Sequence, residues 1–161
     1  MKVIVTDTGI FPGRKNEEDI VIRNNMDIRP CVGCFSCWTK TPGACIHDDE
    51  LYDIGLRLAR CTELVIVSKC LYGGVSPFVK RVIERFLPYM HPDFTVRNGM
   101  MRHKRRYPHT FEISAYFYGE EISDEEKRSA SDLVKANAVN LYASVKDIVF
   151  VKEAWQIGGM S

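Results

Sequence analysis

The sequence predicts an α/β protein built on a mainly parallel β-sheet, because short apolar runs alternate along the chain with amphipathic helical stretches. The clearest strand is Glu63 to Ser68, where residues 64–67 are apolar on both faces, as in a central parallel strand covered by two layers of helices. The clearest helix begins at Ser76-Pro77, since a capping serine precedes a proline at the first helical position. No linker or internal repeat divides the chain, so we expect one domain over residues 1–161.

The other strands are predicted from similar short apolar runs, each bounded by polar residues. One of them alternates, with apolar side chains at 111, 113, 115 and 117 on one face. The predicted ranges are Lys2 to Thr6, Asp19 to Arg23, Thr110 to Tyr118 and Lys146 to Val151.

Two further helices are indicated by the residues that start them. Acidic residues at 48–50 favour a helix N-terminus, after which Leu51, Ile54 and Leu58 line one face. Residues 123–126 fit a capping box, and apolar residues continue at helical spacing as far as Leu141. The stretch from residue 91 to 109 has no period, and we expect a long irregular connection there.

The connection between the first two strands is unusually short. Only residues 7–18 separate them, and this stretch contains Gly9, Pro12 and Gly13. A right-handed crossover with a complete helix needs more residues than that. Either the first helix is short or missing, or the two strands pair differently.

Composition excludes several classes of protein. With 45% hydrophobic and 27% charged residues, the chain has ordinary globular usage and is not a disordered or fibrous protein. A net charge of +1 gives no field to attract nucleic acid or anionic lipid. The apolar runs are too short to span a membrane, and the first residues do not resemble a signal peptide, so we expect a cytoplasmic protein.

Four of the six cysteines lie within fifteen residues, in a C-x2-C-x2-C-x7-C arrangement made by Cys31, Cys34, Cys37 and Cys45. Thiolates at this spacing can converge on a 4Fe–4S cluster or on a tetrahedral zinc ion. The cluster is favoured over zinc because three cysteines form one compact run instead of two separated pairs. The remaining alternative is a folded loop whose free cysteines act as small hydrophobes, as we expect for Cys61.

These motifs make the sequence recognisable. The run 31–38, Cys-Val-Gly-Cys-Phe-Ser-Cys-Trp, with Pro-Gly-Ala-Cys-Ile at 42–46 and the aspartates at 48 and 49, resembles the flavodoxin-like FMN reductase family, particularly its iron–sulfur flavoprotein branch. Segments 65–85 and 103–107 resemble the same family, so that the resemblance covers about the whole chain after residue 19. It implies a flavodoxin-like sandwich with strand order 2-1-3-4-5, FMN at the carboxyl edge of the sheet, and a homodimer or homotetramer.

A ligand loop after the central strand is expected independently of the family, because ligands of open α/β sheets bind beyond the carboxyl ends of the strands. Glycines there would let backbone N–H groups approach a planar ring, and an aromatic side chain could stack on it. The alternative is a plain strand-to-helix turn. The residues concerned are Cys70, Leu71, Tyr72, Gly73, Gly74 and Ser76.

The phosphate end is where the chain departs from the family it resembles. Its relatives use a Gly-Ser-x-Arg loop and a complete helix, whereas here Gly9, Arg14 and Lys15 are the local candidates. The basic cluster 102–106 is a second, remote candidate, which could reach the site from another subunit; both sets could equally be solvated loop charges.

The function indicated is an FMN-dependent oxidoreductase. It would take electrons from a reduced nicotinamide nucleotide or an electron-transfer protein and pass them to a small acceptor, through an iron–sulfur cluster where one is bound. Two alternatives stay open: a degenerate flavodoxin-like protein that has lost flavin and serves as a binding or assembly module, and a zinc-stabilised interaction module. No catalytic residue is singled out, because the cofactor would supply the reactivity.

Overall fold

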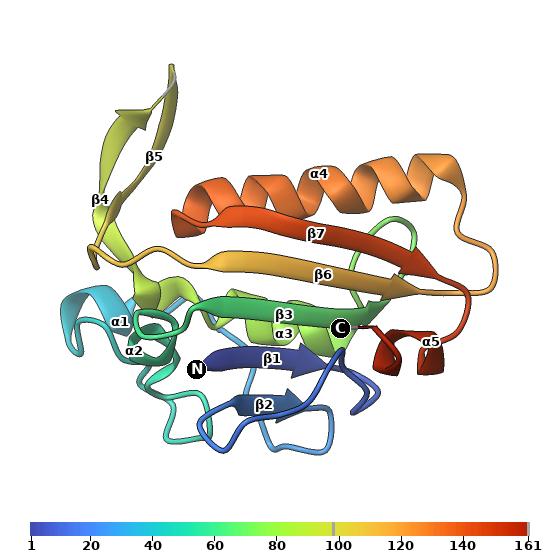
Figure 1. Cartoon of the computed structure of the whole chain (residues 1–161). Helices are drawn as coiled ribbons and strands as arrows, with labels where there is room; N and C mark the ends of the chain where they lie inside the picture. The colour runs from blue at the N-terminus through green and yellow to red at the C-terminus, as the bar shows by residue number, and fades with distance from the viewer. Residues whose placement is uncertain (98, 161) are drawn as a thin grey trace.

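A computed structural model describes residues 1–97 and 99–160 of the chain. Asn98, inside the predicted connection 91–109, and Ser161, the last residue of the predicted domain, lie outside the described residues. Five strands form one parallel sheet in the order β2-β1-β3-β6-β7 (Figure 1). Since β6 and β7 are the fourth and fifth strands of this sheet, the predicted order 2-1-3-4-5 is confirmed.

All five predicted strands exist, with ends within two residues of the prediction. The strands Lys2–Thr6 and Glu63–Lys69 are buried on both faces, which explains their continuous apolar runs. In the register between them, Val3 is paired with Leu64 and Val5 with Ile66. The ranges are β1 (Lys2–Thr6), β2 (Ile20–Arg23), β3 (Glu63–Lys69), β6 (Glu112–Tyr118) and β7 (Ser144–Val151).

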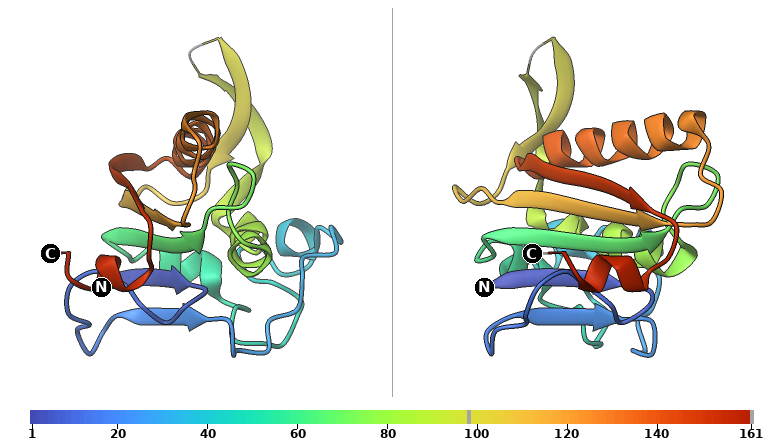
Figure 2. Two further views of the ribbon diagram at one scale, coloured as in Figure 1. Left: turned by 90° about the vertical axis from the view of Figure 1, so that its right-hand side faces the viewer. Right: turned by 45° about the vertical axis from the view of Figure 1, so that its right-hand side comes forward.

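Helices α2 (Ile54–Leu58), α3 (Pro77–Glu84) and α4 (Asp124–Leu141) cover one face of the sheet, and α5 (Trp155–Gly158) lies on the other (Figure 2). The predicted caps are confirmed. The Ser76 hydroxyl accepts a hydrogen bond from the Val79 N–H at 3.4 Å. At α4, Ser123 and Glu126 form the reciprocal capping box, with distances of 3.2 and 2.9 Å.

The first crossover helix is missing, as predicted from the short connection: residues 7–19, all of them described, contain no helix. The C-terminal segment covers part of the face where that helix would lie. Ile157 of α5 is fully buried against Ile4 and its neighbours on that face of the sheet. The Gly13 N–H also donates to the Met160 carbonyl at 2.8 Å, which joins the loop after β1 to the C-terminal segment.

The irregular connection predicted at 91–109 is wrong. Strands β4 (Met90–Arg97) and β5 (Met100–Arg105) form an antiparallel hairpin that projects away from the sheet (Figure 1). Both of its faces meet solvent over much of their length, so burial imposes no apolar alternation on its sequence. Tyr142, at the end of α4, holds the hairpin by donating its hydroxyl proton to the His103 carbonyl at 2.8 Å.

The acidic start predicted for α2 is also wrong, although its apolar residues Leu51, Ile54 and Leu58 are fully buried as expected. The helix begins only at Ile54, because Asp49 turns back to accept the Leu51 N–H at 3.0 Å and pairs with Arg85. Two short helices escaped prediction, α1 (Ser36–Thr39) and the 3-10 turn η1 (Leu87–Tyr89). Among the described residues, no helix is both long and apolar enough to cross a membrane.

Candidate metal centre and sheet edge

The structure brings the four clustered cysteines together. Cys31, Cys34, Cys37 and Cys45 all line one small cavity of about 20 Å³ beside the end of α3. Cys37 is buried, whereas Cys34 is exposed and the other two are half-buried, so the cavity lies close to the surface. Cys61 and Cys70 are buried elsewhere, and Cys61 is the core residue that the sequence predicts.

Local backbone geometry folds the segment into this arrangement. Phe35 has a left-handed φ of 54°, which turns the chain between Cys34 and α1. The Gly43 N–H donates to the Cys37 carbonyl at 3.0 Å, and the Cys45 N–H donates to the Tyr52 carbonyl at 2.7 Å. The first bond returns the long loop to the compact run, as the Pro-Gly pair at 42–43 suggests, and the second joins Cys45 to the segment that follows it.

Trp38 fastens the cysteine segment to the rest of the protein. Its indole N–H lies 3.2 Å from the carbonyl oxygens of both Leu87 and Met90. Its ring packs against His103 of the hairpin at 5.0 Å between centroids and stacks on Phe35 at 5.2 Å. The segment therefore rests on the base of the β4–β5 hairpin.

The thiols differ in acidity. Hydrogen bonds from Ser36 lower the pKa of the exposed Cys34 thiol below its ordinary value. Burial, together with the neighbouring charges of Cys45, Cys31 and Cys34, raises the pKa of Cys37 to about 11. Holding all four as thiolates at neutral pH would therefore require a cation in the cavity.

A buried ion pair joins the two ends of the cysteine segment. The Arg85 guanidinium donates through Nη1 and Nη2 to the Asp49 carboxylate at 2.7 and 2.8 Å, and through Nη1 to the Arg29 carbonyl at 2.7 Å. Burial alone would raise the pKa of Asp49, but hydrogen bonds from Arg85, Leu51 and Arg29 outweigh it and lower that pKa. Arg29 precedes the first cysteine and Asp49 follows the last, so this pair encloses the segment.

Two buried nitrogens in the cavity wall have no hydrogen-bond partner among the described residues, Nε of Arg85 and Nε2 of His47. A group carrying acceptor atoms in the cavity would satisfy the arginine donor, and a sulfide-containing cluster ligated by four thiolates is such a group. Within the described part of the chain, no three His, Cys, Asp or Glu side chains converge as they would around a single metal ion. The four cysteines line one cavity without converging on a common centre in this structure, and the fit to a metal group rests on their chemistry, because four thiols on one short segment are the donors that a thiolate-ligated metal group takes.

Sequence reasoning missed the role of this ion pair. The sequence predicts Asp49 only as part of an acidic helix N-terminus, and it includes Arg85 only as the last residue of a segment that resembles the family. The signal that could have found them is a charged residue at a position of α3 that the apolar pattern would bury.

At the carboxyl edge of the sheet, the loop after β1 satisfies its own amides. The N–H groups of Thr8 and Gly9 donate to the Thr6 hydroxyl at 3.3 and 3.1 Å, and the Ile10 N–H donates to the Thr8 hydroxyl at 3.0 Å. Arg14 and Lys15 are exposed beyond this turn. As folded, the loop does not present consecutive free amides to a phosphate.

Asp7 adds a negative charge beside that loop. Its carboxylate accepts the Lys69 N–H at 2.9 Å and the Tyr118 hydroxyl proton at 3.1 Å, which connects the ends of β1, β3 and β6. Burial and the Asp7 charge raise the pKa of Tyr118 well above its ordinary value, so this hydroxyl stays a donor. A carboxylate here opposes an anionic ligand, and the residues after β1 do not fit the phosphate of FMN.

The predicted ligand loop after β3 is a tight turn. The N–H groups of Leu71 and Gly74 each donate to the other's carbonyl, at 3.0 and 2.8 Å. Gly73 has a φ of 74°, and a Cβ there would lie 2.7 Å from the Cβ of Ser129 on α4, so the turn itself requires this glycine.

Tyr72 points into solvent with 96% of its surface exposed, which leaves its ring free to stack on a ligand. Cys70 is buried, and the Ser76 N–H donates to the Ser68 hydroxyl oxygen at 2.7 Å.

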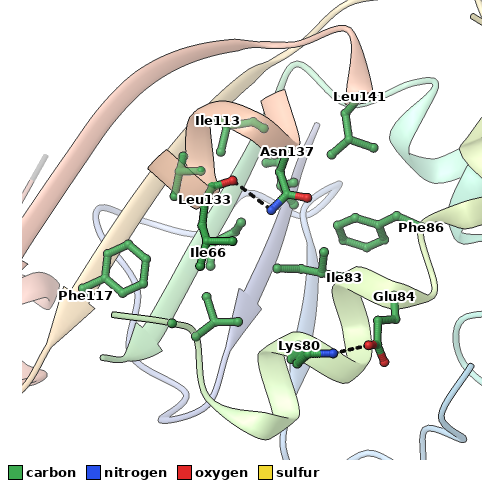
Figure 3. A pocket seen from close by; sticks show the side chains of 14 residues that line it. Ile66, Lys80, Ile83, Glu84, Phe86, Ile113, Phe117, Leu133, Asn137 and Leu141 are labelled. Carbon is green, nitrogen blue, oxygen red and sulfur yellow. Dashed lines mark hydrogen bonds and ion pairs between the residues drawn. The ribbon is translucent and has the colours of Figure 1, made fainter. Parts of the chain in front are cut away.

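An apolar cavity of about 290 Å³ lies between the sheet, α3 and α4 (Figure 3). Gly74 of the predicted ligand loop lines it, together with aliphatic and aromatic side chains from the sheet and both helices. Its polar groups are already paired: Lys80 with Glu84, and the Asn137 amide with the Leu133 carbonyl at 3.0 Å. Glu84 lines this cavity and the cysteine cavity, so the two lie on either side of the last turn of α3.

The basic cluster lies beside the cysteine segment. Arg106 donates from Nε to the Met90 carbonyl at 3.2 Å, and its Cδ lies near the position of a Cβ on Gly43. Nε of Arg102 and Nη2 of Arg106 are buried and have no partner in the described part of the chain. Lys104, in contrast, forms an exposed pair with Asp93 at 3.5 Å.

Comparison with known proteins finds distant relatives. An iron–sulfur flavoprotein of Methanocaldococcus jannaschii is 27% identical over 82 residues, which are 51% of this chain and 41% of the relative. Another, of Archaeoglobus fulgidus, is 25% identical over 83 residues, 52% of this chain and 40% of the relative. The chain thus spans about two-fifths of the length of these curated relatives. No family model matches the sequence.

Among solved structures, a flavone reductase superposes with a TM-score of 0.50 at 14% identity, over 94% of this chain and 54% of that one. A Trp repressor binding protein from Bacillus subtilis reaches a TM-score of 0.49 at 14% identity, over 95% of this chain and 87% of that chain. The first likeness concerns the fold alone. Together with the strand order, it confirms the flavodoxin-like fold, and the curated relatives confirm the resemblance to iron–sulfur flavoproteins that the cysteine motif predicts.

Proposed function

We propose that this chain is a flavin-dependent oxidoreductase of the iron–sulfur flavoprotein kind, with a 4Fe–4S cluster held by Cys31, Cys34, Cys37 and Cys45. It would accept electrons from a reduced nicotinamide nucleotide or a redox protein and deliver them to a small acceptor. The observation that carries the proposal is the cavity in which these four cysteines meet, with buried nitrogens of Arg85 and His47 in its wall.

A bound cluster would supply one-electron chemistry at this site. The residues of the chain have separate tasks around it. The thiolates ligate, the Trp38 indole anchors the segment to the base of the hairpin, and the Arg85–Asp49 pair holds both ends of the loop. The site lies near the surface on the Cys34 side, which is where a redox partner would approach.

The relatives named iron–sulfur flavoproteins support a bound flavin, and we propose that this flavin is FMN. As folded, the residues after β1 do not fit the phosphate of FMN. Gly9, Arg14 and Lys15 could serve only after that loop rearranges, whereas Arg102 and Arg106 are half-buried, and each has a nitrogen without a partner in the described structure that could bond a phosphate once the side chain turns outward. We therefore propose this second set as the phosphate contact, reaching the flavin of a second copy in a homodimer or homotetramer.

The alternative function is a flavodoxin-like binding or assembly module without flavin. It is favoured by one observation, the loop after β1, whose amides are taken by Thr6 and Thr8. In that case the cysteine segment would act alone as the redox or metal centre.

The test is anaerobic purification followed by reconstitution with iron and sulfide. Wild type should bind about four irons per chain and show a broad brown absorption that dithionite bleaches. Replacing the exposed Cys34 by Ala should lower the iron content, while Cys70→Ala, outside the cavity, should leave it unchanged. Iron-free spectra that are the same for wild type and Cys34→Ala would reject the centre. A colourless, iron-free protein that also fails to bind added FMN would support the non-flavin alternative.

A further inference from the structure

The end of α3 places one charged side chain between the cysteine cavity and the protein interior. Arg85 is 1% exposed and is the C-cap residue of α3, immediately after the last helical residue Glu84. Arginine is always charged in proteins, so it brings a permanent positive charge and five N–H donors to this position. Such a side chain is rarely buried without a full set of partners.

Its two terminal nitrogens both have partners. They bind the Asp49 carboxylate as a fork and also reach the Arg29 carbonyl, at 2.7 to 2.8 Å. This pairing fixes the plane of the guanidinium group, because a bidentate contact leaves it little freedom to rotate. It also balances the arginine charge with that of Asp49.

The third nitrogen is left over. Nε of Arg85 is buried and has no hydrogen-bond partner among the described residues, while the residue lines the cavity with all four cysteines. Leaving a buried donor unsatisfied is unfavourable, more so when the donor is charged. A purely structural clamp between Arg29 and Asp49 explains the Nη contacts but not this unpaired donor.

The sulfur atoms of a thiolate-ligated cluster are hydrogen-bond acceptors with net negative charge, and hydrogen bonds to them are a known means of setting reduction potential. We propose that the Arg85 Nε–H donates to a sulfur of the iron–sulfur group bound by the four cysteines and raises its reduction potential, which makes Arg85 a positioning residue that tunes the centre. This inference depends on the cluster of the proposed function. Reduction adds one electron from an external donor, here dithionite, and Arg85 stays protonated in both states, so no proton transfer is involved.

The direction of the effect follows from charge. Reduction makes the cluster more negative, and a fixed donor beside it stabilises the reduced state more than the oxidised one. Since Asp49 neutralises the net charge of Arg85, the effect comes mainly from the oriented N–H. Lysine keeps the positive charge but cannot supply that geometry.

The experiment compares Arg85→Lys with Arg81→Lys, a matched change at an exposed position of the same helix. Both are reconstituted anaerobically, iron and sulfide are counted, and the potential is measured by dithionite titration followed by EPR. Arg85→Lys should make reduction about tenfold less favourable, which is about 59 mV for one electron. Arg81→Lys should match wild type, and equal potentials for all three proteins with full iron content would overturn the inference.

A second measurement keeps the test decisive if Arg85→Lys loses its iron. Wild type grown with ¹⁵N-arginine and reduced with dithionite should show a nitrogen coupling to the cluster in pulsed EPR, which a remote clamp would not produce. Absence of that coupling overturns the role of Arg85 while leaving the cluster intact. Absence of iron in reconstituted wild type instead overturns the proposed function, and this inference with it.

Discussion

The cysteine segment and the loop after β1 are two places where the sequence predicts contacts to a redox group, but they differ in their hydrogen bonding. At the cysteine cavity, buried nitrogens of Arg85 and His47 have no partner among the described residues. In the loop after β1, three successive amides are satisfied by Thr6 and Thr8. A site that binds a polar ligand has hydrogen-bonding groups without protein partners. The cysteine cavity has two such nitrogens among the described residues, whereas these three amides of the loop after β1 are already bonded.

The difference has a structural origin in the missing crossover helix. A complete helix would present free N–H groups at its N-terminus to a phosphate. Here the chain forms a short turn instead, Gly13 bonds to the C-terminal segment, and the Asp7 carboxylate occupies the edge. At the cysteine segment, the Arg85–Asp49 pair instead joins the residues that precede and follow the four cysteines.

The largest effect is expected from breaking that pair. Asp49→Ala leaves the positive charge of Arg85 buried, since the two side chains are only 6% and 1% exposed. Removing one partner of such a pair costs about 3–5 kcal/mol in the free energy of unfolding. Urea unfolding of the metal-free protein measures this, with the exposed Asp48→Ala as control. A loss below about 1 kcal/mol would show that the pair does not hold the segment.

Next in size is a difference between two thiols of the cysteine segment. In metal-free protein at pH 8, Cys34 should react with iodoacetamide about a hundredfold or more faster than Cys37, because one pKa is lowered and the other raised to about 11. Peptide mass spectrometry over time gives both rates. Ser36→Ala should slow Cys34 by removing its hydrogen bond. Equal rates for Cys34 and Cys37 in wild type would mean that the cavity is not formed without metal.

The sheet could be predicted from the sequence because its signals are local or strongly periodic. Continuous apolar runs identified the central strands, and Ser76-Pro77 and the 123–126 box identified two helix starts to the residue. The missing helix followed from counting residues between strands. The spacing of the four cysteines likewise indicated that they lie around one place, and all four line one cavity, whereas their role as metal ligands stays a prediction.

The features that the sequence did not predict depend on contacts between residues far apart in the chain. Nothing near Arg85 in sequence shows that it will meet Asp49, 36 positions away. The β4–β5 hairpin was missed because it has no buried face to impose a period, and it is held instead by Tyr142 of a later helix. The closure of the loop after β1 depends on Met160, near the other end of the chain.

A third prediction compares the two sets of cations proposed for a phosphate. Charge-assisted contacts contribute roughly 1.5–3 kcal/mol each, and about 1.4 kcal/mol is a tenfold change in affinity. Arg102→Gln with Arg106→Gln should therefore weaken FMN binding at least tenfold, whereas Arg14→Ala with Lys15→Ala should change it less than about twofold. Fluorescence titration gives the affinities, and riboflavin, which lacks the phosphate, is the control ligand. The reverse result would place the phosphate at the loop after β1, after a rearrangement.

The smallest effect concerns the opposite, amino edge of the sheet, away from the loop after β1. Glu63 begins the central strand with its side chain 9% exposed, and its carboxylate lies 2.9 Å from Lys2 Nζ and 3.3 Å from Lys146 Nζ. It also accepts the Ser114 hydroxyl proton at 2.6 Å. Burial alone would raise the pKa of Glu63, but these hydrogen bonds and the charge of Lys2 outweigh it and lower that pKa.

Because the pKa of Glu63 is lower in the folded than in the unfolded state, its contribution to stability is complete above the ordinary glutamate pKa and is lost as the pH falls below it through the lowered value. Wild type should therefore lose more unfolding free energy between pH 6 and pH 3 than Glu63→Gln, whose side chain cannot be protonated in this range. Urea unfolding at both pH values measures the difference, and the exposed Glu121→Gln should behave like wild type. If Glu63→Gln kept the full acid sensitivity of wild type, the sheet would be failing at another carboxylate, and the Asp49–Arg85 pair, whose aspartate pKa is lowered in the same direction, would be the next to replace.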